Sequence, residues 1–275
     1  MAMNPKIHTL LGVQIHDQSD QEFESRVTTW LQDASGKVIV TPNAEMLLRA
    51  RKNSRYKSLL NQADLSIADS VSIRYATAAL TDEYLKHRRP GVDALKVIAV
   101  LAATQNKRLM LLGGDSESAV VAAQALKRNI KELDVIGIDP GHLQYNKNAV
   151  TISQTLVESL ERMEADIVAV ALGMEKQEAF MHQMKQLLPN VKVWIGVGGA
   201  LEMISGQKQR APWWLSNVGM EWAWRLIIEP KRIPRILKAA VVFPLVVAGA
   251  TIKQKRFSKA VPRVITEISR QFRNV

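Results

Sequence analysis

The chain has 275 residues, enough for one large domain or for a domain with an appendage. It has no cysteine, which excludes a disulfide framework and thiolate metal sites and favours a reducing compartment. Its net charge is +11, and the excess is confined to one end, since residues 1–207 hold 23 Lys and Arg against 23 Asp and Glu, whereas residues 208–275 hold 14 against 3. This asymmetry predicts an anionic partner at that end, either nucleic acid or a membrane surface.

The first 207 residues alternate between two patterns. Short β-branched runs are separated by stretches with apolar residues three and four apart, which is helical spacing; the runs are KVIVT, DLSIA, RLMLLGG, DVIGID, DIVAVALG and KVWIGVGG. Strands alternating with helices predict an α/β core with a mainly parallel sheet flanked by helices. We therefore divide the chain into a core, 1–207, and an appendage, 208–275. The start lacks a charged segment followed by an apolar one, so no signal peptide is predicted.

Four polar segments follow predicted strands of the core. They are TPNAE (41–45), ADS (68–70), GMEKQE (173–178) and GVGGALEMISGQKQRAP (196–212). Sheets of α/β proteins bind ligands at the carboxyl ends of their strands, so these segments are the candidate site. Each also has a structural interpretation. Asn43 after Thr-Pro is most often a helix N-cap, and Asp69 could equally cap the helix that follows it.

Familiar cofactor and metal motifs are absent from the sequence. It contains no GxxxxGK[ST] phosphate loop and no HExxH, and WIGVGGAL lacks the third glycine of a dinucleotide-binding loop. No Asp-x-Asp is present to hold a divalent ion against a sugar nucleotide. We therefore expect no cofactor and no metal, and any bound diphosphate would be neutralised by backbone N–H groups and by Arg or Lys.

The appendage mixes aromatic, aliphatic and basic residues. Segment 212–229 has the pattern of an amphipathic helix, and residues 239–252 form a run of fourteen residues without a charge, followed by KQKRFSK. The run is shorter than the roughly 20 residues that span a bilayer. Its cationic flanks and preceding tryptophans predict a helix lying in the membrane interface. The alternative is a helix packed on the core with a solvated basic face.

The motifs taken together resemble the WecG/TagA/CpsF family of bacterial glycosyltransferases, from about residue 10 to residue 236. The block GVGGALEMISGQKQRAPWWLSNVGMEWAWRLIIEPKRIPR is similar to the family's Gly-Val-Gly-Gly, Arg-Ala-Pro, Gly-Leu-Glu-Trp, Arg and Glu-Pro-x-Arg pattern. TPNAE resembles its Thr-Pro-Asn motif and GMEKQE its Gly-x-x-x-x-Gln-Glu. The resemblance implies a Rossmann-like core and a helical basic membrane-binding appendage that completes the site.

The resemblance also implies an activity. Relatives transfer N-acetylmannosamine or its uronic acid from UDP, with inversion and without a metal, to undecaprenyl-diphosphate-linked N-acetylglucosamine at the inner face of the bacterial plasma membrane. Expected partners are therefore a UDP-sugar, the lipid-linked acceptor, an anionic membrane and, through the core, further copies of the chain. The pathway fed by the product is not determined by the sequence.

Site residues follow from the same resemblance. Asp69 corresponds to the catalytic base, and Thr41 and Asn43 correspond to the other catalytic positions. The expected substrate-binding residues are Arg88, Gln177, Gly198, Gly199, Arg225, Arg232 and Arg235. A carboxylate can take the proton of the acceptor hydroxyl, and guanidinium groups can stabilise the departing UDP.

Two positions depart from the family pattern. The glycines after the aspartate, Asp-Gly-x-Gly, are replaced by Ser70 and Ser72, and Glu175 stands where relatives often have proline. The first change leaves the donor sugar open, with UDP-glucose as an alternative. A non-enzymatic membrane adaptor and a nucleic-acid-binding protein are the other two alternatives. We expect no nucleic acid, because a groove binder would not place a fourteen-residue uncharged run between its cations.

Overall fold

The structure is a computed structural model that describes residues 5–33, 36–115, 117–146, 149–212, 215, 220–228 and 233–273. Its centre is a parallel sheet with six strands in the described part of the chain, in the order β4-β3-β10-β9-β5-β6. The strands are β3 (Lys37–Val40), β4 (Leu65–Ser66), β5 (Leu109–Gly113), β6 (Val135–Ile138), β9 (Ile167–Ala171) and β10 (Val193–Gly196). All six predicted strand runs are thus confirmed. They are almost wholly apolar because helices cover both faces of a parallel sheet.

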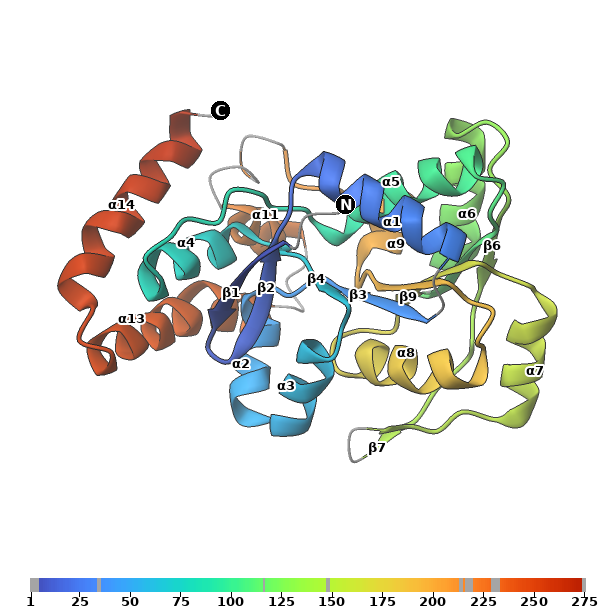
Figure 1. The fold of residues 1–275 in the computed structure, drawn as a ribbon, viewed down its shortest axis with the longest axis horizontal. Helices are drawn as coiled ribbons and strands as arrows, with labels where there is room; N and C mark the ends of the chain where they lie inside the picture. Colours follow the sequence, from blue (N-terminus) through green and yellow to red (C-terminus); the bar gives the residue numbers. More distant parts are fainter. Residues whose placement is uncertain are drawn as a thin grey trace.

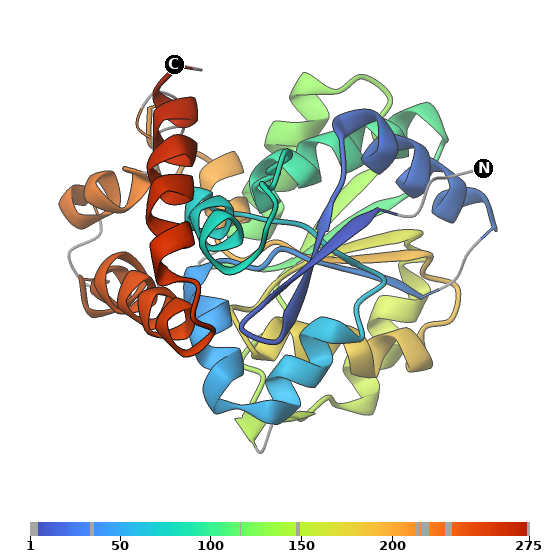
Figure 2. The same cartoon turned by 60° about the vertical axis from the view of Figure 1, so that its left-hand side comes forward.

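Helices pack on the sheet in two layers (Figures 1 and 2). One layer shares a buried apolar cluster and consists of α2 (Ala44–Lys52), α3 (Ser54–Asn61), α4 (Val71–Leu80), α7 (Gln154–Arg162) and α8 (Lys176–Leu187). The other layer shares a second cluster and consists of α1 (Asp20–Asp33), α5 (Gly91–Thr104), α6 (Ser118–Asn129) and α9 (Ala200–Ile204). Trp194 of β10 is fully buried in the first cluster. The predicted α/β fold with flanking helices is confirmed.

Two short antiparallel hairpins were not predicted. The first joins β1 (Lys6–Leu10) to β2 (Val13–Asp17), and the second joins β7 (Tyr145–Asn146) to β8 (Ala149–Val150). Leu11 and Gly12 form the two-residue turn of the first hairpin, with φ values of 52° and 86°. Such left-handed pairs match the twist of hairpin strands. The hairpin meets the sheet edge through His16, whose Nδ1 accepts the N–H of Ser66 at 2.9 Å.

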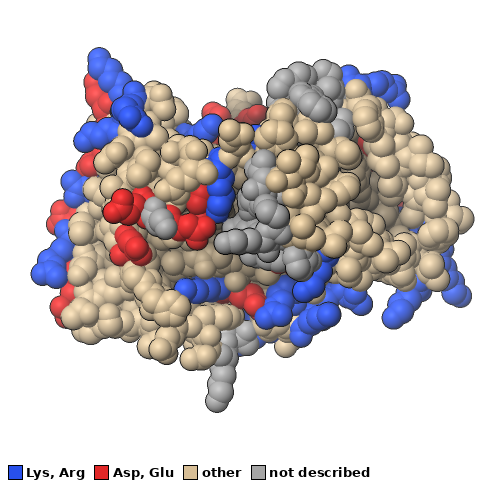
Figure 3. All heavy atoms as spheres, turned by 180° about the vertical axis from the view of Figure 1, so that it is seen from behind, with Lys and Arg blue, Asp and Glu red and all other residues tan. Residues whose placement is uncertain are grey.

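Residues beyond 207 are mainly helical where they are described. The elements are α11 (Glu221–Ile228), α12 (Ile233–Leu237), the π-helical turn η2 (Lys238–Val242), α13 (Phe243–Lys253) and α14 (Phe257–Arg273). α13 and α14 lie on the left in Figure 1, with α11 nearer the middle, and α13 packs against α2 and α4. In the view from behind, Lys and Arg side chains rim this side of the molecule, and acidic side chains gather at the other end (Figure 3). Among the described helices, none is both long and apolar enough to cross a bilayer.

The predicted interfacial run, 239–252, is partly a core element. Phe243 and Val247 of α13 are 2% and 7% exposed and belong to the first apolar cluster, and Thr251 on the same side is buried. Leu245 and Ile252 on the other side are exposed. One side of α13 therefore packs on the core, as the alternative to an interfacial helix required, whereas the other side is exposed.

Candidate active site

The four predicted segments meet at one edge of the sheet. Thr41 follows β3, Asp69 follows β4, Gln177 lies in the loop and helix after β9, and Gly198 follows β10. These four strands are neighbours in the parallel sheet, so their carboxyl ends are side by side. Segments separated by more than 150 residues in the sequence are thereby brought together.

The helices after β3 and β10 leave this edge in opposite directions. α2 follows β3 into one layer and α9 follows β10 into the other. Ligands of open α/β sheets bind where the connections diverge in this way. The buried hydroxyl of Thr41 lies at this divergence and donates to the carbonyl oxygen of Gly196 at 2.9 Å, joining β3 to β10. Thr41 therefore holds the two strands of the candidate site in register.

Asp69 is partly exposed and caps a helix other than the expected one. Its Oδ1 accepts the N–H of Gly91, the first residue of α5, at 2.9 Å, whereas α4 directly after it has no side-chain cap. The backbone N–H of Asp69 donates to the carbonyl oxygen of Pro42 at 3.1 Å. The carboxylate is thus held between the β3 and β4 loops by the positive end of α5.

Arg88 lies beside Asp69. Its Nη1 donates to the main-chain oxygen of Asp69 at 3.4 Å. The loop that carries Arg88 is fixed from behind by Asp17 of β2, whose carboxylate accepts the N–H groups of Lys86 and His87, each at 2.9 Å. Burial would raise the pKa of Asp17, but hydrogen bonds from His8, Lys86 and His87 hold it well below its usual value. The charged form of Asp17 is therefore part of the support of Arg88.

Asn43 is the N-cap of α2. Its Oδ1 accepts the N–H of Met46 at 3.1 Å, which confirms the structural interpretation for this residue. Asn43 thus stands two residues after Thr41 at the same edge of the sheet, where its side-chain oxygen stabilises the start of the helix.

Gln177 joins the loops after β9 and β10. Its side chain is buried, and its Oε1 accepts the N–H of Gly198 at 3.1 Å. A Cβ at Gly196 would lie 2.9 Å from Gln177 Nε2, so a side chain there would displace this amide. Gly198 has φ +51°, which favours glycine, and a Cβ there would meet no atom within 4 Å. Gly199 is the N-cap of α9. The predicted Gln177, Gly198 and Gly199 are therefore adjacent.

Glu178 was missed by the sequence reasoning, although it is the last residue of the quoted GMEKQE. Its buried carboxylate accepts from Gln177 Nε2 and from the N–H of Glu175, both at 2.7 Å. Burial raises the pKa of Glu178 to about 7. Glu178 thus determines which way the amide of Gln177 points, because an ionised carboxylate attracts the NH2 end and leaves the oxygen for Gly198.

Glu175, where relatives often have proline, connects three helices. Its carboxylate binds Arg49 Nε and Asn53 Nδ2, both at 2.8 Å, and also caps α8. Its φ of +70° is closed to proline, whose ring fixes φ near −65°. The loop before Gln177 therefore has a backbone that a proline could not adopt.

A second acidic residue was also missed. Glu202 of α9 is 4% exposed, and its Oε1 accepts the N–H of Asp115 at 3.3 Å and lies 3.4 Å from Lys208 Nζ. Its Oε2 has no hydrogen-bond partner among the described residues. Asp115 follows β5, so the site edge continues to that strand. A buried carboxylate oxygen without a partner can accept from a hydroxyl donor.

The predicted appendage arginines cannot be placed at the site. Arg232 lies outside the described residues, and the side chains of Arg225 and Arg235 are outside them too. Their contribution to phosphate binding stays a prediction. The described residues contain no group of three or more His, Asp and Glu side chains placed to hold a metal ion.

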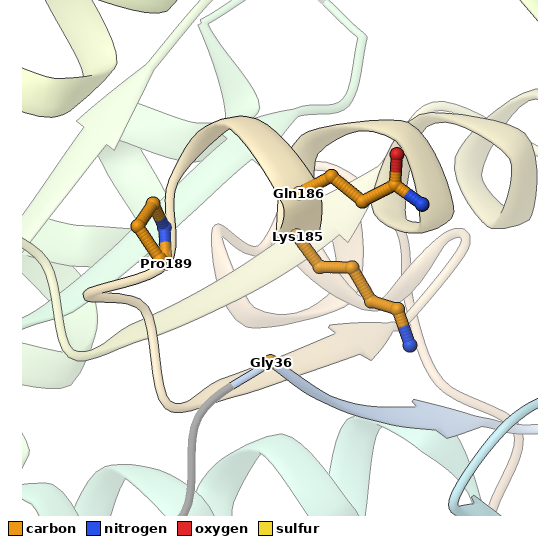
Figure 4. A pocket seen from close by; sticks show the side chains of 4 residues that line it. All are labelled: Gly36, Lys185, Gln186 and Pro189. Carbon is orange, nitrogen blue, oxygen red and sulfur yellow. The ribbon is translucent and has the colours of Figure 1, made fainter.

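The opposite edge of the sheet has a small hollow of about 180 Å³, lined by Gly36, Lys185, Gln186 and Pro189 (Figure 4). Gly36 directly precedes β3, so the hollow lies at the amino end of the strands. Lys185 and Gln186 extend to one side and Pro189 lies on the other, so the polar groups do not converge. The hollow lacks the convergent polar groups of a ligand site.

The chain is similar in sequence to a known family of proteins. A family model described as the Glycosyl transferase WecG/TagA/CpsF family matches residues 8–257. Proteins named N-acetylglucosaminyldiphosphoundecaprenol N-acetyl-beta-D-mannosaminyltransferase are similar in sequence. The one from Staphylococcus aureus (strain MRSA252) is 28% identical over 249 residues, covering 90% of this chain and 94% of its own.

Two Bacillus proteins of the same name are comparable. The Bacillus spizizenii protein is 28% identical over 263 residues, covering 94% of this chain and 96% of its own. The Bacillus subtilis protein is 30% identical over 209 residues, covering 76% and 78%. The match to the family model spans the described sheet and its carboxyl edge. The chain therefore belongs to the WecG/TagA/CpsF family of glycosyl transferases.

Proposed function

We propose that the protein transfers N-acetylmannosamine, or its uronic acid, from UDP to undecaprenyl-diphosphate-linked N-acetylglucosamine, with inversion and without a metal. The names of its relatives support this acceptor and the first of these sugars. The observation that carries the proposal is the position of Asp69, between Thr41 and Arg88 at the point where the sheet connections diverge.

In the proposed reaction, the Asp69 carboxylate takes the proton of the acceptor hydroxyl. The hydroxyl oxygen forms a bond to the anomeric carbon from the face opposite UDP, while the bond from that carbon to the diphosphate oxygen breaks. UDP leaves with the electron pair. Arg88 beside Asp69, and the appendage arginines Arg225, Arg232 and Arg235, would stabilise the charge that develops on the diphosphate. Asn43 and Gln177 would orient the donor.

The nucleotide would lie toward β10 and β5. Glu202 Oε2 could accept from a ribose hydroxyl there, and the backbone around Gly198 and Gly199 leaves room for a close approach of the ligand. Because the acceptor is a lipid, the enzyme would work as a peripheral protein on the inner membrane face, with its cationic appendage toward anionic lipid. Oligomers through the core, which the resemblance implies, remain a prediction.

A donor screen tests the proposal. The full chain is incubated with a short-chain lipid-diphosphate N-acetylglucosamine and a panel of UDP-sugars, and released UDP and product mass are measured. Turnover with UDP-N-acetylmannosamine or its uronic acid supports the proposal. If the protein binds UDP but shows no turnover with any donor, the proposal is contradicted and a non-enzymatic adaptor is favoured.

A second candidate is a transferase of the same family with another donor, such as UDP-glucose. The observation that favours it is the loop after Asp69, where the hydroxyls of Ser70 and Ser72 lie 2.7 Å apart in a hydrogen bond. Two glycines could not form this contact. The loop that would lie beside the donor sugar therefore carries hydroxyl groups that glycines lack. Turnover with UDP-glucose alone would establish this alternative.

A further inference from the structure

Helix α14 packs on the core through polar side chains as well as through Ala260 and Val264. Glu267 is 1% exposed and forms an ion pair with Arg74 of α4, with Arg74 Nε and Glu267 Oε1 2.8 Å apart. Gln271, also buried, donates to the same oxygen at 2.8 Å. Figure 2 shows α14 standing against α4. Such a buried ion pair favours one orientation of the helix against the core.

Further cations fix α14 to the loop that leads to Arg88. Arg256 binds both carboxylate oxygens of Asp82, at 2.7 and 3.0 Å. Arg263 donates to the carbonyl oxygen of Glu83 at 2.8 Å. The ring of Tyr84 is contacted by the guanidinium groups of Arg263 and Arg270, 4.3 and 4.2 Å from its centre. The orientation of α14 is therefore determined along its whole length.

One apolar side of α14 faces outward. Four of its large apolar residues recur at helical spacing and are exposed, namely Phe257 (47%), Val261 (43%), Ile265 (57%) and Phe272 (61%), whereas Val264 and Ile268 are partly buried. The buried side is marked by Ala260, Glu267 and Gln271, about a quarter turn away. A helix on a soluble core normally buries its apolar side and exposes its polar side. The exposed row, called here the outer face of α14, thus lacks a cover in the described part of the chain.

The charge around the outer face indicates which partner would cover it. Residues 233–273 contain nine Lys and Arg and one acidic residue, Glu267, which is already paired. Lys259, Arg270 and Arg273 are exposed on the side of α14 away from the outer face, and Lys253 and Lys255 are exposed at the corner with α13. This is the arrangement of a helix that lies in the interface of an anionic bilayer.

A second copy of the chain fits the outer face poorly. A two-fold contact would place the same surface against itself and bring the cationic segments of two copies near each other. Like charges in contact cost free energy, whereas anionic lipid headgroups would neutralise them. The charge therefore favours lipid over self-association.

We infer that the outer face of α14, formed by Phe257, Val261, Ile265 and Phe272, inserts among the lipids of an anionic bilayer. The inference rests on the proposed function, because the acceptor there is a lipid. It assigns a docking face to a helix that lies beyond the residues matched by the family model, which end at 257. Through Arg74 and Asp82, the docked helix would hold α4 and the loop before Arg88 at the membrane surface.

A triple variant of the full chain tests the docking face. Val261→Gln, Ile265→Gln and Phe272→Gln keep helix propensity and remove apolar area. Flotation with vesicles of phosphatidylethanolamine and phosphatidylglycerol measures binding. We expect the partition coefficient to fall by roughly a hundredfold. A matched control changes three exposed apolar residues of the core, Val100, Val120 and Leu187, to Gln, and should bind as the wild type does.

Two further measurements separate the explanations. Turnover with a water-soluble short-chain acceptor should be unchanged in the triple variant. A variant that no longer binds vesicles but keeps this turnover has lost membrane docking and has kept the proposed activity. Light scattering gives the mass of the wild type and of the variant. Unchanged flotation of the variant, a wild type that does not float, or a smaller mass in the variant alone would overturn the inference, the last by showing that a second copy covers the outer face.

Discussion

At the scale of single residues, Asp69 combines a structural contact with the proposed chemistry. In Asp69→Asn, the amide oxygen can still accept the N–H of Gly91, so α5 keeps its cap. The amide cannot take a proton, and we expect kcat to fall by about 10²- to 10⁴-fold. Calorimetric titration with UDP should give unchanged affinity. Full turnover by this variant would show that Asp69 is not the base. A non-enzymatic adaptor would be insensitive to the substitution.

Glu178 makes a pH-dependent prediction. Because burial raises its folded-state pKa to about 7 from an ordinary 4.5, the folded protein binds a proton more readily than the unfolded chain does between these values. The free energy of unfolding contributed by Glu178 therefore falls as the pH rises from about 4.5 to about 7. In Glu178→Gln, urea unfolding should lose this part of its pH dependence.

The same substitution should alter activity. Glutamine at 178 has one acceptor oxygen for two donors, Gln177 Nε2 and the N–H of Glu175, so Gln177 is held less firmly. We expect KM for the donor to rise more than kcat falls. We also expect the rate of the wild type to fall below about pH 7, as Glu178 takes up a proton, and the rate of the variant to lack this fall. An unchanged profile would show that Glu178 is only a structural residue.

At the scale of elements, the first hairpin supports the loop that carries Arg88. Asp17→Asn places an NH2 group beside the N–H groups of Lys86 and His87, and we expect about 2–3 kcal/mol of destabilisation and a higher KM for the donor. The ionised Asp17 contributes stability above its usual pKa of 3.8, and this is lost as the pH falls toward its lower folded-state value. Urea unfolding at neutral and acid pH measures both effects.

The control for Asp17 is an exposed carboxylate. Asp134 pairs with Arg108 at the surface, with 2.7 Å between Asp134 Oδ2 and Arg108 Nε. Surface pairs contribute about 0–1 kcal/mol, so Asp134→Asn should unfold nearly as the wild type does. Equal losses in the two variants would show that Asp17 has no special part in holding the loop.

At the scale of the whole molecule, the core and the cationic helices are joined by packing as well as by sequence. Deletion of residues 208–275 should release the protein from membranes and abolish transfer to lipid-linked acceptor. It would also uncover α4 where Phe243 and Val247 are buried, so thermal unfolding must be measured alongside vesicle flotation. A truncated, folded protein that still floats with anionic vesicles would contradict membrane binding through this segment.

The expected metal independence is a second prediction about the whole enzyme. Guanidinium groups and backbone N–H groups, rather than a divalent ion, would neutralise the diphosphate. EDTA should therefore leave the rate of the donor assay unchanged. Strong inhibition that is reversed by added Mg²⁺ would show that a metal takes part.

Much of this architecture could be predicted from local pattern. The six strand runs were readable because a strand buried on both faces must be continuously apolar, and the site segments were readable because polar residues follow those runs. The β1–β2 hairpin was missed, since two five-residue strands and a Leu-Gly turn give a weak signal. Glu178 and Glu202 were missed because their importance depends on burial beside residues distant in the chain.

The sequence by itself determined the order of strands and helices, the location of the positive charge and the family resemblance, because these depend on neighbouring residues and on motifs. Only the tertiary structure decided that Asp69 caps α5 rather than α4, that one side of α13 belongs to the core, and that α14 buries Glu267 and Gln271. The physical reason is that a helix pattern shows which side is apolar, whereas the partner available to each side, here Arg74 for Glu267, is fixed by the packing of distant elements.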